Sequence, residues 1–381
     1  MRLQLTLILV GVTAVVRADG GPVRVGLDTL FYADSDRVIV VSPQVAVHAA
    51  LDDDGGEVGA RVVVDGISAA SVDVVSEATA KFTELREEAD FSASKRLGAW
   101  LPSLRYRFST EPDYRSHGIG VGLERWLAGK DTTFSVSYDL KLDTVGRTGT
   151  PFDAWSRSLT NHAVELGVTQ LLDPRTLLRG VYTLTVQDGY MAKPYRFVPL
   201  FTAAGIDAAR ADGATLDLAT FDRYRENQRP PEEVPDLRVR HAVGARLLRY
   251  LPGLGGSLRL DYRFYADSWN VIGHTLEAEL ALGLGAKWIL RLNARGYEQG
   301  AAYFYQRTYV VAANGEIPTY RTVDRDLGAA WGASGGASIE LTGKTVSGYL
   351  EASAQLMYWP DFLFLTDRTA LVTQVGVRFT P

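Results

Sequence analysis

Hydrophobic and polar residues alternate along much of the chain. Between residues 131 and 144, Phe134, Val136 and Tyr138 occupy every second position, and the positions between them are polar or charged. Successive side chains of a β-strand point to opposite faces, so this pattern predicts strands with one apolar and one charged face. The same alternation recurs at residues 103–109, 258–267, 288–295 and 350–358.

The length of these runs separates two all-β architectures. Strands of soluble β-sandwiches usually have about 5–6 residues, whereas a tilted membrane-spanning strand needs about 9–11. The runs at residues 131–144 and 258–267 reach the longer class. A soluble sandwich remains the alternative, but length and repetition favour a transmembrane antiparallel β-barrel.

The links between the runs give the strand count. Outer-membrane barrels alternate short periplasmic turns with longer outer loops. Short turns are predicted near residues 52–56, 97–102, 127–131, 173–175, 251–255, 285–287 and 342–344. Outer links are predicted at residues 67–82, 145–160, 190–237, 303–326 and 360–367, with tight ones near 34–36, 112–114 and 269–271. The count is about sixteen strands with both termini periplasmic, an even number as in single-chain bacterial barrels.

The N-terminus has the pattern of a secretory signal peptide. Arg2 precedes an apolar run from Leu3 to Val16, and Val16 and Ala18 suit a cleavage site after Ala18. The run is too short to span a bilayer, which needs about 20 apolar residues. We therefore expect residues 1–18 to be removed. Residues 19–381 are then a single outer-membrane β-barrel domain, with a long outer loop at residues 190–237.

The C-terminus predicts a closing strand. Leu371, Val375, Val377 and Phe379 alternate with polar residues, and such strands are read by the barrel assembly machinery. Phe379 stands two residues before the end, which departs from the usual terminal aromatic residue. The alternative is an ordinary edge strand.

Composition excludes several classes of protein. The chain has no Cys, which excludes a lipid-anchored lipoprotein, a disulfide framework and a thiolate metal site. A net charge of −5 gives no reason to expect nucleic acid. The expected location is the outer membrane of a Gram-negative envelope, with outer-membrane lipid around the barrel.

If the apolar face meets lipid, the charged face lines the lumen. Opposed Arg and carboxylate groups are a porin device for focusing the field across a pore; the alternative is simple pairing between neighbouring strands. The lumen-lining candidates are Arg105, Arg107, Asp139, Arg179, Arg259, Asp261, Arg263, Arg291, Arg295 and Glu351. The leading hypothesis is a porin-like channel for small polar solutes or ions, with no cofactor, no metal and no catalytic residues.

Two features leave alternatives open. The loop at residues 190–237 has an apolar and aromatic first half, so it either folds into the lumen as a constriction or forms an outer cap. The Trp residues fall mostly at predicted strand ends, which indicates aromatic girdles at the two membrane interfaces.

Two other functions are also considered. One is a closed barrel with a structural or assembly-partner role at the outer membrane. The other is an outer-membrane hydrolase, because Asp153, Ser156, Ser158 and His162 flank one outer loop. Nearness in sequence does not establish a catalytic triad, which is recognised by its geometry.

Several segments together resemble a known family. They lie at residues 32–36, 64–76, 146–152, 193–196, 265–269 and 306–309. As an ordered set they resemble an uncharacterised family of bacterial envelope proteins, the domain of unknown function 3570 family. The resemblance implies an outer-membrane barrel of unknown substrate, and it supplies no catalytic residues.

Overall fold

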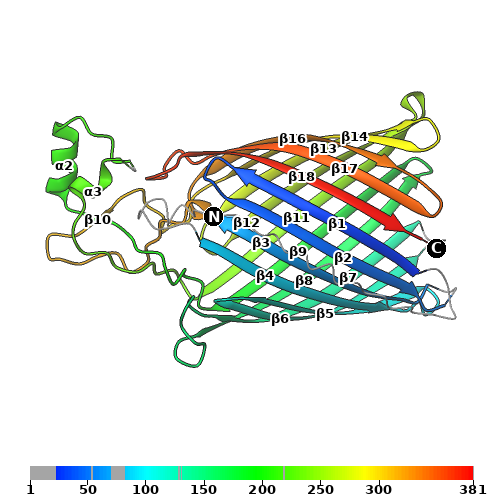
Figure 1. The fold of residues 1–381 in the computed structure, drawn as a ribbon, viewed down its shortest axis with the longest axis horizontal. Helices are drawn as coiled ribbons and strands as arrows, with labels where there is room; N and C mark the ends of the chain where they lie inside the picture. Colours follow the sequence, from blue (N-terminus) through cyan, green and yellow to red (C-terminus); the bar gives the residue numbers. More distant parts are fainter. Residues whose placement is uncertain are drawn as a thin grey trace, which may run out of the picture.

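Sixteen antiparallel strands form a closed barrel, which confirms the predicted fold (Figure 1). The computed structural model describes residues 23–52, 55–69, 82–127, 129, 131–217 and 219–380. The predicted signal peptide lies outside these residues. The barrel strands are β1 (Val23–Asp34), β2 (Ile39–Ala50), β3 (Glu57–Ala69), β4 (Phe82–Ser94), β5 (Trp100–Glu111), β6 (Tyr114–Leu127), β7 (Thr132–Val145), β8 (Arg157–Asp173), β9 (Thr176–Gly189), β11 (Leu237–Leu251), β12 (Gly256–Asp267), β13 (Ile272–Leu284), β14 (Trp288–Gln299), β16 (Ala330–Leu341), β17 (Val346–Tyr358) and β18 (Asp367–Phe379).

Each barrel strand pairs with its neighbours along the chain, and β1 closes the wall against β18. In the closing pair Leu27 lies opposite Val377 and Phe31 opposite Thr373. The predicted C-terminal strand is therefore a closing strand and not a free edge. Closure leaves no open sheet edge, which is the condition for β-strands to cross a membrane.

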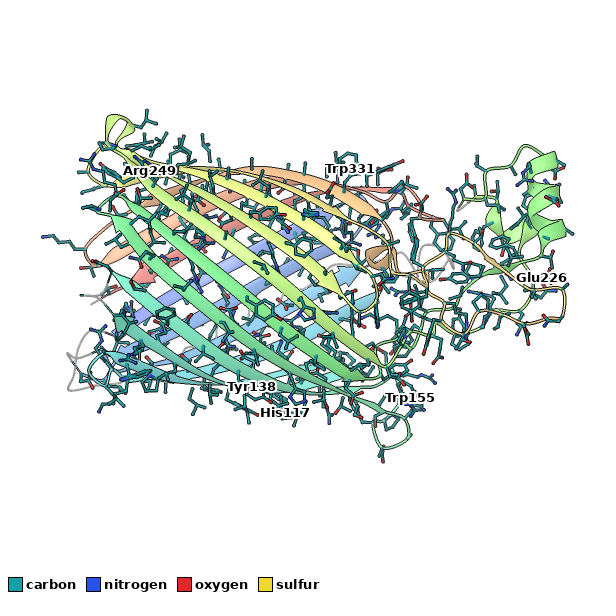
Figure 2. All side chains as sticks on the ribbon, turned by 180° about the vertical axis from the view of Figure 1, so that it is seen from behind. His117, Tyr138, Trp155, Glu226, Arg249 and Trp331 are labelled. Carbon is teal, nitrogen blue, oxygen red and sulfur yellow. The ribbon has the colours of Figure 1, made fainter. Side chains whose placement is uncertain are left out.

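The two faces of the wall differ in chemistry. Leu27, Phe91 and Leu276 belong to a large set of exposed apolar side chains on one face. Figure 2 shows Tyr138 and His117, which belong to that face, projecting from the outer surface of the barrel. The alternate positions on the same strands carry the charged residues. An apolar exterior is what a barrel surrounded by lipid requires.

The links at the two ends of the barrel differ in length, as predicted. One end carries short turns such as the 3₁₀ turn η2 (Pro252–Leu254), where Gly255 takes a left-handed conformation at φ 59°. That conformation strains any residue with a Cβ, so Gly is favoured there. The other end carries three long described links at residues 190–236, 300–329 and 359–366. We call these three links together the outer cap.

The outer cap stands beyond the barrel and has hydrophobic cores of its own. Figure 1 shows α2 (Ala203–Ala211), α3 (Phe221–Tyr224) and β10 (Leu200–Phe201) outside the end of the barrel. β10 pairs in parallel with β15 (Tyr309–Val310). Further along the cap lies the 3₁₀ turn η3 (Arg325–Leu327). Of the two interpretations of the 190–237 loop, the outer cap is the one that fits α2 and α3.

The predicted aromatic girdle is wrong for two Trp residues. Trp269 and Trp359 are only 3% and 1% exposed, and both pack in cores at the cap end, against Phe304 and Phe362 respectively. They follow strand ends in the sequence, but the outer cap folds over them. Among the described residues, no helix is long and apolar enough to cross a membrane.

Candidate functional site

All ten predicted lumen-lining residues share the face of the wall opposite to Tyr138. The strand registers place them there, because Asp139 is the chain neighbour of Tyr138 and pairs with Gly120, which itself pairs with Arg105. Seven of the ten are in ion pairs and three are not. The paired residues are Arg105, Arg107, Asp139, Arg179, Arg259, Asp261 and Arg291.

One ion-pair cluster lies on β3, β4 and β5. Arg107 lies opposite Asp90 in the strand register, and its Nε lies 3.0 Å from the Asp90 carboxylate. Arg61 bonds Glu88 at 2.7 Å, and Arg86 contacts both Glu88 and Asp65. Opposite charges that lie directly or diagonally across from one another on neighbouring strands stabilise the sheet, and here they neutralise its charged face.

A second cluster lies on β11 to β16. Arg259 is its centre and contacts Asp261 at 2.9 Å, Glu277 at 2.5 Å and Glu279 at 3.3 Å. Arg291 on β14 continues the chain of charges to Glu340 on β16 at 2.6 Å. In this part of the wall, the charged residues pair with one another between neighbouring strands, which is the alternative to opposed charges across a pore.

Arg263, Arg295 and Glu351 have no opposite charge within ion-pair distance among the described residues. Arg263 and Arg295 line a cavity of about 540 Å³ together with Arg179, whose guanidinium lies 3.6 Å from Glu165. The Arg295 guanidinium lies 6.0 Å from the centre of the Tyr297 ring. Glu165, Asp261 and Glu277 line the same cavity, and Glu277 lies opposite Arg295 in the strand register, so the cavity holds charges of both signs.

The outer mouth of the barrel holds a second charged cavity, of about 520 Å³. One side carries Glu84 on β4, Glu111 on β5 and Asp113 in the following turn. Another side carries Arg238 and Arg240 on β11, and Lys193 and Asp324 of the cap also line the cavity. Strands β5 to β9 separate β4 from β11 in the wall. The cavity therefore has an acidic and a basic side.

The basic side is held rigidly. Arg238 bonds the fully buried carboxylate of Asp267 at 2.5 Å, and its guanidinium lies 4.2 Å from the centre of the Trp269 ring. Asp267 also accepts hydrogen bonds from the backbone N–H groups of Trp269 and Val271, at 2.9 and 3.0 Å. The tight turn between β12 and β13 thus fixes the carboxylate that positions Arg238.

Sequence reasoning missed the basic side of this cavity. Arg238 and Arg240 alternate with Val239 at the start of β11, so the same alternation that identified the other candidates was present. Arg240 has no ion-pair partner among the described residues, although its side chain is half-buried.

The buried carboxylate of Glu232 connects two links of the outer cap, residues 190–236 and residues 300–329. Glu232 is 4% exposed, bonds Arg196 at 3.0 Å and accepts hydrogen bonds from the Lys193 N–H and the Thr322 hydroxyl. Burial raises the pKa of Glu232, and Arg196 opposes this shift. Arg196 also bonds Asp324 at 2.7 Å. Arg196 therefore links residues 190–236 to residues 300–329.

The predicted hydrolase residues do not form a triad. The Nδ1 atom of His162 lies 2.8 Å from the hydroxyl of Tyr138, on the outer surface. Ser158 is four residues from His162 on the same strand, roughly 13 Å at about 3.3 Å per residue. No hydrogen bond joins either Ser156 or Ser158 to His162 in the described part of the chain. The ranges that the structure describes also contain no cluster of three or more metal-binding side chains.

Known proteins resemble the chain in two ways. The family model described as a protein of unknown function, DUF3570, matches residues 69–361. Among solved structures, a bacterial polysaccharide outer membrane secretin aligns with a TM-score of 0.50 and 9% identity, over 96% of this chain and 99% of that one. CdiB from Acinetobacter baumannii aligns with a TM-score of 0.52 and 11% identity, over 94% of this chain and 60% of CdiB.

A third structure, the siderophore receptor PirA from Pseudomonas aeruginosa, aligns with a TM-score of 0.46 and 8% identity, over 93% of this chain. The chain spans 61% of that receptor's length. No curated protein matches the sequence. At these identities the likeness concerns the barrel fold alone.

Proposed function

Because the chain belongs to the DUF3570 family of proteins of unknown function, we propose its function from the barrel itself: a channel in the outer membrane for small polar solutes or ions. In this proposal residues 1–18 direct export, and the barrel assembly machinery inserts the chain through its C-terminal strand β18. The ten residues predicted from the sequence then line the path of the solute.

One observation carries the proposal: the mouth cavity lies between an acidic and a basic side, above a charged barrel face. Glu111 lies on the acidic side and Arg240 on the basic side. Charged groups on opposite sides of a narrow path create a transverse field, which orders polar solutes and water. The two helices of the outer cap stand beyond the end of the barrel and do not enter it (Figure 1).

Conductance of the refolded chain in a planar bilayer tests the proposal. We expect discrete, reproducible current steps that a heat-denatured sample does not give. A folded barrel that passes no current contradicts the channel. Substitution then identifies the path: Arg240→Ala shifts the reversal potential in a salt gradient toward cations, and Glu111→Gln shifts it toward anions. Arg210→Ala is the matched control, because Arg210 is exposed on α2.

A second candidate function, an assembly partner, rests on the outer cap. Tyr303 is 53% exposed, Phe197 42% and Tyr320 38%. Exposed aromatic residues are common where proteins bind one another. Co-purification of an envelope protein with the native chain, lost in a Tyr303→Ala/Tyr320→Ala variant, favours this function over the channel.

A further inference from the structure

Four of the five histidines lie on the outer surface of the barrel, and each is bonded to a tyrosine. The Nδ1 atom of each His lies 2.8–2.9 Å from the Tyr hydroxyl oxygen. The pairs are Tyr106–His117, Tyr138–His162, Tyr182–His241 and Tyr262–His274. Each joins the two strands of one outer hairpin, in β5–β6, β7–β8, β9–β11 and β12–β13. We call these four pairs the Tyr–His row.

The four pairs repeat one geometry. In each hairpin the Tyr lies opposite the residue two positions after the His: Tyr106 pairs with Ile119, Tyr138 with Val164, Tyr182 with Val243 and Tyr262 with Leu276. Four repeats of one diagonal contact, on four successive hairpins, indicate a shared role. The sequence carries it as Tyr-x-Phe or Tyr-x-Leu before each outer link and His-x-Ile, Val or Leu after it.

The row keeps a constant height around the barrel. His117 pairs with Leu142, whereas His162 pairs with Leu140, two residues deeper on the same strand. The same shift of two residues over two strands takes His162 to His241, and His241 to His274. Strands of a closed barrel are tilted, so this stagger is what keeps equivalent residues level.

The row lies near the upper end of the apolar surface. The next outward-facing residue above the histidine is polar for His117 (Arg115) and His162 (Thr160), and apolar for His241 (Val239) and His274 (Ile272). Going down the outer face from His117, the next three side chains are Ile119, Val121 and Leu123, and the fourth is Arg125. Three apolar residues likewise separate His162 from Gln170 and His241 from Arg249, whereas below His274 the outward-facing residues stay apolar as far as Leu284. Eight residues at about 3.3 Å and a tilt of about 40° span roughly 20 Å, close to the apolar band of about 25 Å in outer-membrane barrels. Figure 2 shows Arg249 near the end of the barrel away from the cap.

The hydrogen bond leaves one donor on each ring. A phenol hydroxyl is a stronger donor than a neutral imidazole N–H, and the imidazole nitrogen is the stronger acceptor. The Tyr hydroxyl therefore donates to Nδ1, which places the ring proton on Nε2. Within the described part of the chain, none of the four Nε2 atoms has a hydrogen-bond partner, and the four rings lie on the outer surface. An unsatisfied donor at the edge of the hydrocarbon is costly, so an acceptor from outside the chain is expected.

We propose that the Tyr–His row binds lipid: each Nε2–H donates to an oxygen of a lipid headgroup at the outer boundary of the hydrocarbon. The acceptor is an ester carbonyl or a phosphate oxygen, the acceptors that phosphorylated, ester-linked lipids present at this depth. The row covers the half of the wall from β5 to β13. The proposal does not depend on whether the barrel conducts.

Solid-state NMR of the chain with ¹⁵N-labelled histidine, in nanodiscs of ester-linked phosphatidylethanolamine and phosphatidylglycerol, tests this binding. We expect protonated Nε2 signals that are dephased by lipid ³¹P if phosphate is the acceptor, or by ¹³C-labelled lipid carbonyl if the ester is. His48 is the internal control, because it faces the other side of the wall and contacts Glu57 at 3.1 Å. Absence of dephasing by both nuclei overturns the proposal.

Two variants assign the signals. Replacing the four row histidines with Phe keeps an aromatic ring and removes the donor, so the dephased signals are lost and only that of His48 remains. Replacing the four tyrosines with Phe frees Nδ1, so the rings divide between two tautomers and the Nε2–H signal weakens. If the variants do not fold, the wild-type experiment decides alone. A row shielded by a second copy shows no lipid dephasing, and this outcome also rejects the proposal.

Discussion

Arg105 on β5 and Asp139 on β7 form an ion pair although β6 lies between their strands. The residue between them is Gly120, which pairs with both in the strand register. A Cβ built at Gly120 meets the Asp139 carboxylate at 2.5 Å and Arg105 at 3.5 Å. The absence of a side chain at this one position therefore lets two charges meet across a strand.

Gly120→Val is expected to break this pair while leaving the barrel folded. The added side chain collides with the end of a flexible carboxylate, which can turn away. The pair is partly exposed, so its loss costs at most about 1 kcal/mol. Unfolding of the variant in urea, followed by the heat-modifiable migration of the barrel, measures this change. A chain that no longer closes contradicts the expectation. Gly129→Val, in the turn between β6 and β7, is not a suitable control because the φ of Gly129 is 68°.

Arg325→Ala is expected to loosen the outer cap. The Arg325 guanidinium bonds Asp36 at 2.6 Å, and both side chains are at least 90% buried. The pair joins η3 to the turn between β1 and β2, and removing one partner of a buried pair costs about 3–5 kcal/mol. Limited proteolysis of the folded barrel measures the cap selectively. The double variant Arg325→Met/Asp36→Leu should lose less, because it leaves no charge buried; an equal loss contradicts this explanation.

The cap is expected to become less stable as pH rises from mildly acidic values. Burial raises the pKa of Glu232 above its ordinary value of 4.5. Because the pKa of Glu232 is higher in the folded cap than in the unfolded chain, the stability that Glu232 contributes is fully present below the unfolded pKa. That stability is lost as pH rises through the folded pKa. Glu232→Gln removes this contribution and flattens the pH dependence of the urea midpoint of cap tryptophan fluorescence. Glu233→Gln is the control, since the Glu233 side chain is exposed; an unchanged slope in Glu232→Gln contradicts the assignment.

Replacing residues 203–225 with a short Gly–Ser linker is expected to leave the barrel intact. α2 and α3 pack on each other and on Leu363 of the cap, and their core contains no barrel strand residue. The barrel should therefore keep its heat-modifiable migration and its far-ultraviolet β signal. Loss of both would show that the cap is needed to close the wall.

The sequence alone determined the barrel. Alternation in long runs fixed the strands, the face of each residue and the count of sixteen, because the period of two is local and survives any tertiary arrangement. It also placed all ten predicted charges on one face. The links at residues 145–160 and 190–237 fell close to the observed ends of β7, β8, β9 and β11.

Only the tertiary structure decided which residues meet. Arg105 reaches Asp139 because closure and register place Gly120 between them, and a register shift of one residue would remove the contact. Arg238 and Arg240 line one cavity with Glu111, a relationship between distant strands that no local pattern encodes. Trp269 and Trp359 are buried because the cap folds over them. The sequence contains the pattern of the Tyr–His row four times. That the four pairs lie at one height around the barrel depends on strand stagger, which exists only once the sheet closes.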